Sequence, residues 1–494
     1  MHKISPACPG GCTYIVQGRR KRHEQTPSCD AAAHVAGWTL RAEWGSLTRM
    51  TTKAKPTDQA IAGAPARAES ARCDVAVMGR GNSAALTALA LAQSGFSVWA
   101  ELVHGDVQPA AQPPSDARDT RWQRVLALSP GARRALETLG VWQRLKAGHA
   151  PVADIAVGGP NHGDLPLRFA DAKTPDRPVD VLSHIVSLAD LTEAIGDTLR
   201  ACTALGGAAQ ISAAAHDFNS QTGALTFADT TQLRVNLLVD ASGAQSQWRT
   251  RAGIACLHYD YRSHALSAEV ALGAPHGQVA RQVFLADGPL AILPLPAPTR
   301  AALVWSLPAR KAAALAQCDE DVFNHELNVA ARTLVGPFEH LALAGPRAYQ
   351  PLKAQIAEAF TGTRLALVGE AAHVIHPLAG QGMNLTLRDI GALVDTLCEA
   401  RRLGLACSDA TMLENYARLR RADALAGAFG THGLAEIFSG PRPMRAVAAT
   451  GLRGVGFIAD NWPELKNAFR RQADQGLGPL SDLFAGAPSS EKTR

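Results

Sequence analysis

The chain of 494 residues is 47% hydrophobic and 19% charged, a composition that lets it bury a sizeable core and excludes a disordered protein. Its formal net charge is +5. Residues 1–49 carry seven Lys/Arg against three Asp/Glu and so contribute +4, which leaves the rest nearly neutral. No basic footprint of a nucleic-acid-binding protein exists, and no nucleic-acid partner is expected. At roughly 100 to 200 residues per domain, the length predicts two or three domains.

Cysteine usage and hydropathy indicate a reducing compartment and no membrane span. Nine cysteines without paired spacing outside the N-terminus favour free thiols. No run approaches ~18 apolar residues, and no charged start precedes the apolar core of a signal peptide. We therefore expect a cytoplasmic protein, or one peripheral to the inner membrane.

Residues 1–72 show no sustained period of helix or strand, so we expect a disordered leader, and Met50 offers an alternative translation start. Potential zinc ligands occur here, namely Cys8, Cys12, His23, Cys29 and His34. The CPGGC spacing leaves three intervening residues and has no second pair, so no metal is expected.

Order is expected from Cys73. The stretch DVAVMGRGNSAALTALALAQSGFSVWAE predicts a βαβ unit, with a Gly-x-Gly turn between the first strand and an Ala/Leu-rich helix. Gly79 would permit the tight turn, Gly81 would let a pyrophosphate approach the backbone, and Ala84 would pack helix on strand. Glu101 ends the second strand, 22 residues after Gly79, where dinucleotide sites place an acid on the ribose. The alternative is a nucleotide-free βαβ core with a surface glutamate.

Coarser patterns run through the middle of the chain. Ser129-Pro130 predicts the N-cap and first position of a helix. Short strands and loops follow over 152–187, then a helix at about 189–205 and a buried strand that ends at Asp240. Residues 257–352 read mostly as strands, which indicates a separate antiparallel sheet.

The densest motif is GEAAHVIHPLAGQGMNLTLRDIGAL, which follows an apolar strand. Glu370 would lie at the carboxyl edge of a sheet, where a carboxylate can accept from sugar hydroxyls. Gly380-Gln381-Gly382 then opens a helix whose backbone N–H groups favour nearby negative charge by up to ~2 kcal/mol. Two alternatives stay open. Glu370, His373 and His376 have a spacing that would face a metal on a helix, and His373 alone reads rather as a satisfied structural residue.

This motif closely resembles the GD-type flavin motif of class A flavoprotein aromatic hydroxylases, and specifically of the ubiquinone-biosynthesis hydroxylases, whose pattern runs G-D/E-A-A-H, H-P, A-G-Q-G, N-L and R-D. The resemblance also covers the Gly79 turn and four further stretches, LALSPGARRALETLGVW, DASGAQSQWR, FLADGPLAILPL and VWS. It spans roughly residues 73–477.

The resemblance implies a mixed α/β fold of the p-hydroxybenzoate hydroxylase type. An interrupted Rossmann-like FAD-binding domain would comprise residues 73–150, 187–252 and 353–415. An antiparallel-sheet substrate domain would comprise residues 151–186 and 253–352, and a C-terminal helical region would comprise residues 416–494.

The resemblance also implies an activity. Members are FAD-dependent monooxygenases in which reduced FAD reacts with O₂ to give a C4a-hydroperoxide that hydroxylates the ring of a polyprenylated phenol. The reductant would be NAD(P)H or a ferredoxin. The flavin supplies the chemistry, while the protein orients the ring and excludes water. Partners would be the polyprenyl-phenol substrate, O₂ and other ubiquinone-biosynthesis proteins.

By position, the resemblance assigns cofactor contacts. Glu370, directly after Gly369, matches the acid that contacts the ribityl chain, and Arg124 matches an arginine near the flavin. The loop beside the isoalloxazine would be formed by Pro377, Gly380, Gln381, Gly382, Met383 and Asn384. A ring-activating residue would sit near Tyr259, Tyr261 and His264. Core packing is the alternative for Tyr261, and no catalytic base is assigned.

Departures from the family pattern fall on cofactor contacts. The acid after the second strand usually stands one residue later, at Leu102 here, so Glu101 would face the other side of a regular strand. Ala84 replaces a glycine, and an arginine expected near Ala189 is missing. Ser242-Gly243 replaces an Asp-Gly pair that touches FAD and NAD(P)H. Two alternatives therefore remain, a flavin-poor scaffold in a ubiquinone-synthesis complex and another FAD oxidoreductase acting on isoprenoids.

The stretch MRAVAATGLRGVGFIADNWPELKNAFRR near the C-terminus mixes apolar residues with arginine and lysine. Such a pattern is typical of a helix lying on a membrane surface, where it would deliver a lipid substrate. The alternative is an ordinary packing helix with a solvated basic face.

Overall fold

A computed structural model describes the chain from Arg72 onward, and every described residue belongs to one compact unit, Leu47–Arg494. The described residues are 72–101, 122–159, 167–169, 181–202, 214–335, 338–376, 380–439, 464, 470–472, 474–477 and 479–486. The expected leader with its potential zinc ligands, Pro377, and residues 440–463 with the start of the basic C-terminal stretch lie outside the described residues.

The first sheet has a parallel centre with strand order β18-β10-β1-β2, and antiparallel neighbours extend it to seven strands. Its strands are β1 (Arg72–Met78), β2 (Val98–Ala100), β8 (Ala215–Asn219), β9 (Ala224–Phe227), β10 (Gln232–Asp240), β17 (Thr361–Gly362) and β18 (Leu365–Leu367). The parallel strands are rich in buried aliphatic residues because helices and loops cover both faces of the sheet. Since parallel strands end at the same edge, the turns that follow β1, β2, β10 and β18 meet there.

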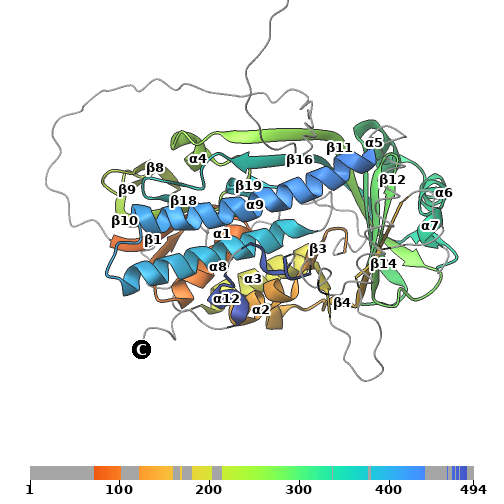
Figure 1. The fold of residues 1–494 in the computed structure, drawn as a ribbon, viewed down its shortest axis with the longest axis horizontal. Coiled ribbons are helices and arrows are strands. Elements are labelled where there is room, and N and C mark those ends of the chain that lie inside the picture. The colour runs from red at the N-terminus through yellow and green to blue at the C-terminus, as the bar shows by residue number, and fades with distance from the viewer. Residues whose placement is uncertain are drawn as a thin grey trace, which may run out of the picture. The chain divides into compact units, whose positions relative to one another are not determined.

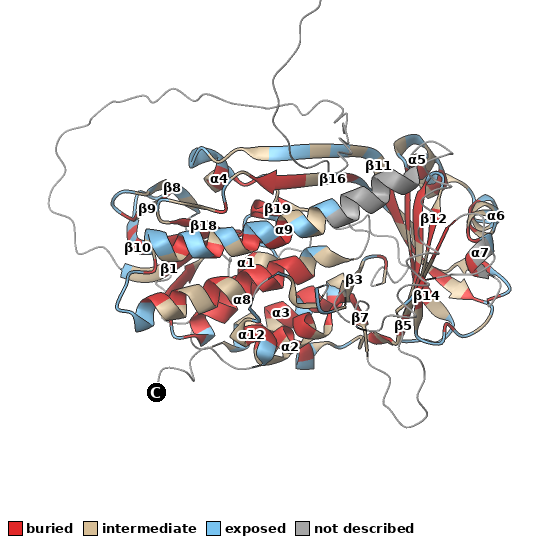
Figure 2. Cartoon of the chain, in the orientation of Figure 1, coloured by how far each residue is buried: buried red, intermediate tan, exposed pale blue. Residues whose placement is uncertain are grey.

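Four helices pack on or beside this sheet (Figure 1). They are α1 (Asn82–Gln93), α3 (Leu188–Ala201), α8 (Gln381–Arg402) and α9 (Ala410–Ser439). Helix α1 is buried continuously from Ala84 to Ala92, because α3 and α8 both contact it. Helix α9 runs beside α8 and carries both buried and exposed positions (Figure 2).

The second sheet has nine strands in the order β19-β16-β11-β14-β13-β12-β5-β6, with β15 paired to β11. All its pairs are antiparallel except β12 with β5. The strands are β5 (Asp154–Gly158), β6 (Leu167–Arg168), β11 (Cys256–Leu272), β12 (Val279–Leu285), β13 (Gly288–Pro294), β14 (Arg300–Pro308), β15 (Leu341–Leu343), β16 (Ala348–Ala357) and β19 (His373–Val374).

The prediction of strands over 257–352 is wrong for one part of that stretch. Helices α5 (Ala309–Gln317), α6 (Glu320–Ala330) and α7 (Arg332–Val335) follow β14. They are amphipathic, and residues such as Leu315 and Phe323 pack with Trp305 of β14 in one buried cluster. An open antiparallel sheet needs such a cover on its apolar face.

A small antiparallel sheet links these two layers. Its order is β3 (Val125–Leu128), β7 (Ser183–Ser187) and β4 (Ala150–Val152). Its apolar side packs on the second sheet through a cluster made of Ala150, Val152, Ile185, Ala280, Leu295 and Ala302. Helix α2 (Pro130–Thr138) follows β3, and the Ser129 hydroxyl accepts from the Ala132 amide at 3.2 Å, which confirms the predicted N-cap.

The remaining elements are short. They are η1 (Trp142–Arg144), α4 (Gln247–Arg251), η3 (Gly369–Ala371) and α12 (Asp482–Ala485). Helix α12 packs against α2 and α8, far back in the sequence. None of the helices described here is long and apolar enough to cross a membrane. The mixed α/β fold class is confirmed, while the division into FAD-binding and substrate domains remains a prediction.

Candidate active site

The glycine turn after β1 lies against the turn after β10. Gly79 has φ +113°, and a Cβ atom there would lie 2.6 Å from the Ala241 carbonyl oxygen, so only glycine fits. Gly81 behaves differently, because a Cβ atom at this position would meet nothing within 4 Å. Gly81 is also the N-cap of α1 and has no side chain to cap the helix. The turn therefore offers free backbone N–H groups beside open space, the arrangement that binds a phosphate.

Glu101 points toward this turn. Its Oε2 atom accepts from the Gly79 amide at 2.9 Å, and its Oε1 atom lies 3.9 Å from an Arg80 guanidinium nitrogen. The side chain of Glu101 is 19% exposed. The orientation away from the turn that a regular strand implies is thus not observed, and Glu101 can still accept from a further hydroxyl. Its contact with a ribose remains a prediction.

Gly369 joins the two halves of the site. It has φ +63°, and a Cβ atom there would lie 3.1 Å from the Thr386 side chain and 3.2 Å from the Ser83 hydroxyl. The start of α1 and the first turns of α8 therefore meet at this residue. Glu370 is exposed, and its Oε2 atom lies 4.0 Å from where a Cβ atom of Gly243 would stand. Both predicted carboxylates thus lie at the carboxyl edge of the parallel sheet.

The start of α8 lies on β3. Gly380 is the N-cap of α8 with φ +61°, and a Cβ atom there would lie 2.8 Å from the Ala127 Cβ atom. Asn384 fastens this contact, since its Nδ2 donates to the Ala127 carbonyl at 2.9 Å and its Oδ1 accepts from the Ser129 amide at 3.0 Å. The side chain of Asn384 is buried and holds the loop in place instead of facing outward.

The other loop residues lie more openly. Gly382 is exposed, and a Cβ atom there would meet nothing within 4 Å. Gln381 and Met383 are half-buried in the first turn of α8. Arg124 is exposed just before β3, and its carbonyl accepts from the Leu188 amide at 3.0 Å. Contacts of these residues with a flavin remain predictions.

Ser242, which stands where the family pattern has an acid, is exposed but hydrogen-bonds back to the end of β10. Its amide and hydroxyl both donate to Asp240 Oδ1, at 3.0 and 2.5 Å. The Ser246 hydroxyl donates to Asp240 Oδ2. Asp240 is fully buried and holds the turn after β10 by these contacts. The Ser242 side chain is therefore committed to the sheet end and adds no charge to the site.

The two histidines of the motif have different surroundings. His373 Nε2 lies 2.6 Å from Asp389 Oδ2 with both side chains at most 2% exposed, so His373 is a structural residue. His376 is buried, and its ring meets the Tyr261 ring edge to face, with centroids 4.6 Å apart. Tyr261 in turn contacts Tyr259 at 4.9 Å, whereas His264 contacts Tyr349 instead. The described part of the chain holds no group of three His, Cys, Asp or Glu side chains suited to a metal.

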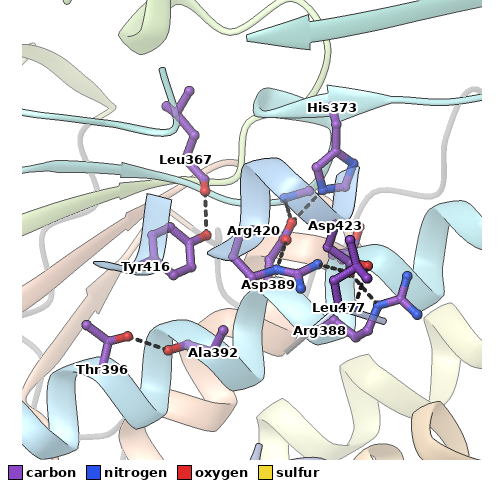
Figure 3. Close-up of polar contacts among 12 residues, drawn as sticks. Leu367, His373, Arg388, Asp389, Ala392, Thr396, Tyr416, Arg420, Asp423 and Leu477 are labelled. Carbon is purple, nitrogen blue, oxygen red and sulfur yellow. Dashed lines mark hydrogen bonds and ion pairs between the residues drawn. The ribbon is translucent and has the colours of Figure 1, made fainter. Parts of the chain in front are cut away.

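A buried charge network behind Gly369 was not predicted from the sequence (Figure 3). Asp389 accepts from the Gly369 amide at 2.9 Å, from His373, and from Arg420 Nε at 2.8 Å. Burial alone would raise the pKa of Asp389, but the positive charges of His373 and Arg420 outweigh it and hold the pKa below its usual value. Two signals of this network exist in the sequence, namely Arg388-Asp389 within the motif and the spacing of Tyr416, Arg420 and Asp423 at i, i+4 and i+7.

These residues fit a bound FAD. Open space remains at Gly81 and Gly382, at the N-termini of α1 and α8, neither of which has a side-chain cap. The carboxylates of Glu101 and Glu370 stand at the same sheet edge, where they can accept from hydroxyls of the cofactor. A dinucleotide with two phosphates and several hydroxyls matches this set of donors and acceptors.

Comparison with known proteins decides the family. Residues 72–426 match the FAD binding domain family. Over 422 residues the chain is 32% identical to ubiquinone hydroxylase UbiL of Rhodospirillum rubrum, covering 84% of this chain and 93% of the relative. The chain belongs to the ubiquinone-biosynthesis flavin hydroxylases. A second relative of this hydroxylase is the 3-demethoxyubiquinol 3-hydroxylase of Escherichia coli, 30% identical over 71% of this chain and 86% of the relative.

Solved structures agree on the fold of this FAD-dependent hydroxylase. The p-nitrophenol 4-monooxygenase PnpA of Pseudomonas putida superposes with a TM-score of 0.61 at 17% identity, over 82% of this chain and 99% of PnpA. PqsL of Pseudomonas aeruginosa, a probable FAD-dependent monooxygenase, gives 0.58 at 21% identity, over 76% and 99% of the two chains. These structures confirm the fold, while the predicted resemblance to class A flavin monooxygenases is confirmed by the family match and the relatives.

Proposed function

We propose that this hydroxylase adds one oxygen atom to the aromatic ring of a polyprenylated phenol in ubiquinone biosynthesis. The observation that carries the proposal is the match to ubiquinone hydroxylase UbiL, which extends over 84% of this chain and 93% of that relative. Among relatives with other names, mouse COQ6 is a mitochondrial ubiquinone biosynthesis monooxygenase, 32% identical over 48% of this chain.

The residues of the site have defined tasks in this proposal. Bound FAD supplies the activation of O₂. The Gly79–Gly81 turn and the N-terminus of α1 hold the pyrophosphate, while Glu101 and Glu370 accept from the ribose and ribityl hydroxyls. Gly380–Gly382 at the N-terminus of α8 favours negative charge on the reduced ring system.

The substrate ring would lie on the other side of this loop. Three aromatic rings contact one another in a row. They belong to Tyr259 and Tyr261 on β11 and to His376, which follows β19. Such rings can stack on an aromatic substrate and orient it. None of these residues is assigned as a catalytic base.

The activity is tested with purified protein, FAD, a reductant, O₂ and a short-tailed polyprenyl phenol, with the product identified by mass spectrometry. A hydroxylated product that disappears in the Glu370→Gln variant supports the proposal. A scaffold protein would form no product, and in cells the Glu370→Gln substitution would leave ubiquinone levels unchanged, which is the outcome that contradicts hydroxylation.

For the electron donor we propose NAD(P)H or a ferredoxin, with ferredoxin favoured. Ser242 stands where the family pattern has an acid expected to contact NAD(P)H, and its hydroxyl donates to Asp240 at 2.5 Å. Anaerobic stopped-flow reduction separates the two donors. Ferredoxin should reduce the flavin faster than NADPH does, and faster reduction by NADPH would reverse the assignment.

We further propose a cytoplasmic location, with contact to the surface of the inner membrane and to other ubiquinone-biosynthesis proteins. The support is the basic, apolar composition of residues 444–471 together with a lipid substrate. Flotation with anionic liposomes tests membrane contact in the full chain and in a chain that ends at Pro441. Equal flotation of both proteins would exclude this segment as the membrane contact.

A further inference from the structure

One face of α9 lies directly behind the Gly369 loop. Tyr416, Arg420 and Asp423 occupy this face at i, i+4 and i+7, and each is at most 3% exposed. The Tyr416 hydroxyl donates to the carbonyl of Leu367 at 2.7 Å, two residues before Gly369. Helix α9 thus contacts the end of β18, where the loop toward Glu370 begins.

Asp389 of α8 connects this face to the loop itself. Its Oδ2 atom accepts the Gly369 amide at 2.9 Å, and its Oδ1 atom accepts Arg420 Nε at 2.8 Å (Figure 3). Arg420 reaches further, since its NH2 atom lies 2.8 Å from Asp423 Oδ2. The position of Arg420 therefore depends on the charges of both Asp389 and Asp423, and the Gly369 amide is linked to Arg420 through Asp389.

Asp423 also contacts the C-terminal segment, of which residues 474–477 and 479–486 are described. Its Oδ1 atom accepts from the Leu477 amide at 3.0 Å, and a Cβ atom on Gly476 would lie 2.6 Å from both carboxylate oxygens. The segment is anchored elsewhere too, because the Asp474 carboxylate accepts from the Gly131 amide at 2.6 Å. Phe484 is buried in the core beneath α2 and α8.

The charges of this network are closely balanced. Arg388 Nε lies 3.0 Å from Asp423 Oδ2, so Asp423 serves two buried guanidinium groups, on Arg388 and Arg420. Loss of its charge would leave Arg420 to Asp389, and Arg388 to Asp389 and Asp474. An uncompensated buried charge is costly, so Arg420 and Asp389 would move, and the Gly369 amide with them.

We propose that Asp423 is a positioning residue for the flavin. Asp423 contacts the docked C-terminal segment, and through Arg420 and Asp389 it couples that docking to the position of the Gly369 loop. The inference rests on FAD binding and not on the identity of the phenol. If the polyprenylated phenol proves not to be the substrate, the inference about FAD binding still holds. It implies that the last part of the chain must be docked before the cofactor is held tightly.

The test compares Asp423→Asn with Asp395→Asn. Both are isosteric, and both residues accept from the same C-terminal segment, since Asp395 Oδ2 accepts from the Asp482 amide at 3.2 Å. Asp395 lies on a different face of α8 from Asp389, so it does not enter the Gly369 network directly. FAD affinity is measured by fluorescence titration of the apoproteins, and their thermal unfolding is compared by circular dichroism.

Asp423→Asn should weaken FAD binding by about tenfold, the usual size of coupling between contacting charged groups, and should alter the visible spectrum of bound flavin. Asp395→Asn should change neither. Gly476→Ala, which displaces the segment from Asp423 without removing a charge, should also weaken FAD binding, and it carries the test alone if Asp423→Asn does not fold. Unchanged affinity in a folded Asp423→Asn or Gly476→Ala protein would overturn the proposal.

Discussion

Two glycines only two residues apart have opposite relations to their surroundings. Gly79 touches the backbone of Ala241 and has a positive φ, whereas Gly81 borders open space. Gly79→Ala should therefore destabilise the apoprotein by at least about 2 kcal/mol, through strain and a backbone clash. Gly81→Ala should change apoprotein stability by less than about 1 kcal/mol yet abolish FAD binding, because the added methyl fills the phosphate space.

Urea unfolding of the two apoproteins and FAD titration separate these effects. Gly79→Ala should lower the stability of the apoprotein, whereas Gly81→Ala should lower the affinity for FAD. Tight FAD binding by a folded Gly81→Ala protein would mean that the phosphate does not lie at this turn.

Glu101 gives a second prediction at this scale. In Glu101→Gln the side-chain oxygen can still accept from the Gly79 amide. The negative charge is lost, so the hydrogen bonds expected from the ribose hydroxyls become weaker. FAD affinity should fall about tenfold, because hydrogen bonds to a charged acceptor contribute about 1.5 to 3 kcal/mol. Isothermal titration calorimetry measures this. Glu137→Gln, which removes a surface ion pair with Arg133 on α2, is the matched control and should have no effect.

Among whole elements, α8 and α9 carry a prediction about pH. The pKa of Asp389 is lowered in the folded protein, so the folded state holds its proton less tightly than the unfolded chain does. Its contribution to stability is present above the unfolded pKa of about 4 and is lost as pH falls through the lower folded value. Urea unfolding measured from about pH 7 down to about pH 3 should show this loss of stability in acid.

The Asp389→Asn variant tests that assignment. It should lose about 3 kcal/mol at neutral pH, because Arg420 is left buried without its full counter-charge, and its stability should fall less steeply in acid. An acid profile as steep as that of the unmodified protein would place the titrating group elsewhere.

Elements also show what the sequence can and cannot predict. The Gly79 turn, the Ser129 cap and the loop before α8 were predicted because each depends on a few adjacent residues with a strong conformational preference. Helices α5 to α7 were missed because apolar strands flank them and their own stripe was read as part of the sheet. The network around Asp389 was missed because its members come together only when α8, α9 and β19 pack.

At the scale of the molecule, the site is made by segments that are distant in sequence. Turns after β1, β2, β10 and β18 meet at one sheet edge. Strand β3, which belongs to the small sheet, contacts α8. Adjacent motifs and the family resemblance therefore named residues that the fold brings to one place, and their contacts with the cofactor remain predictions. No local pattern predicts the hydrogen bond from Ser242 to Asp240 or the one from Asn384 to β3, because both depend on side-chain contacts.

The central claim is that this FAD-dependent hydroxylase transfers oxygen from O₂ to the ring of a polyprenylated phenol. The most direct measurement is a reaction of the reduced, FAD-loaded protein with a short-tailed polyprenyl phenol under ¹⁸O₂, followed by mass spectrometry of the product. The account predicts that the new hydroxyl group carries ¹⁸O. A product without the label, or oxidation of the prenyl tail in place of the ring, would contradict it.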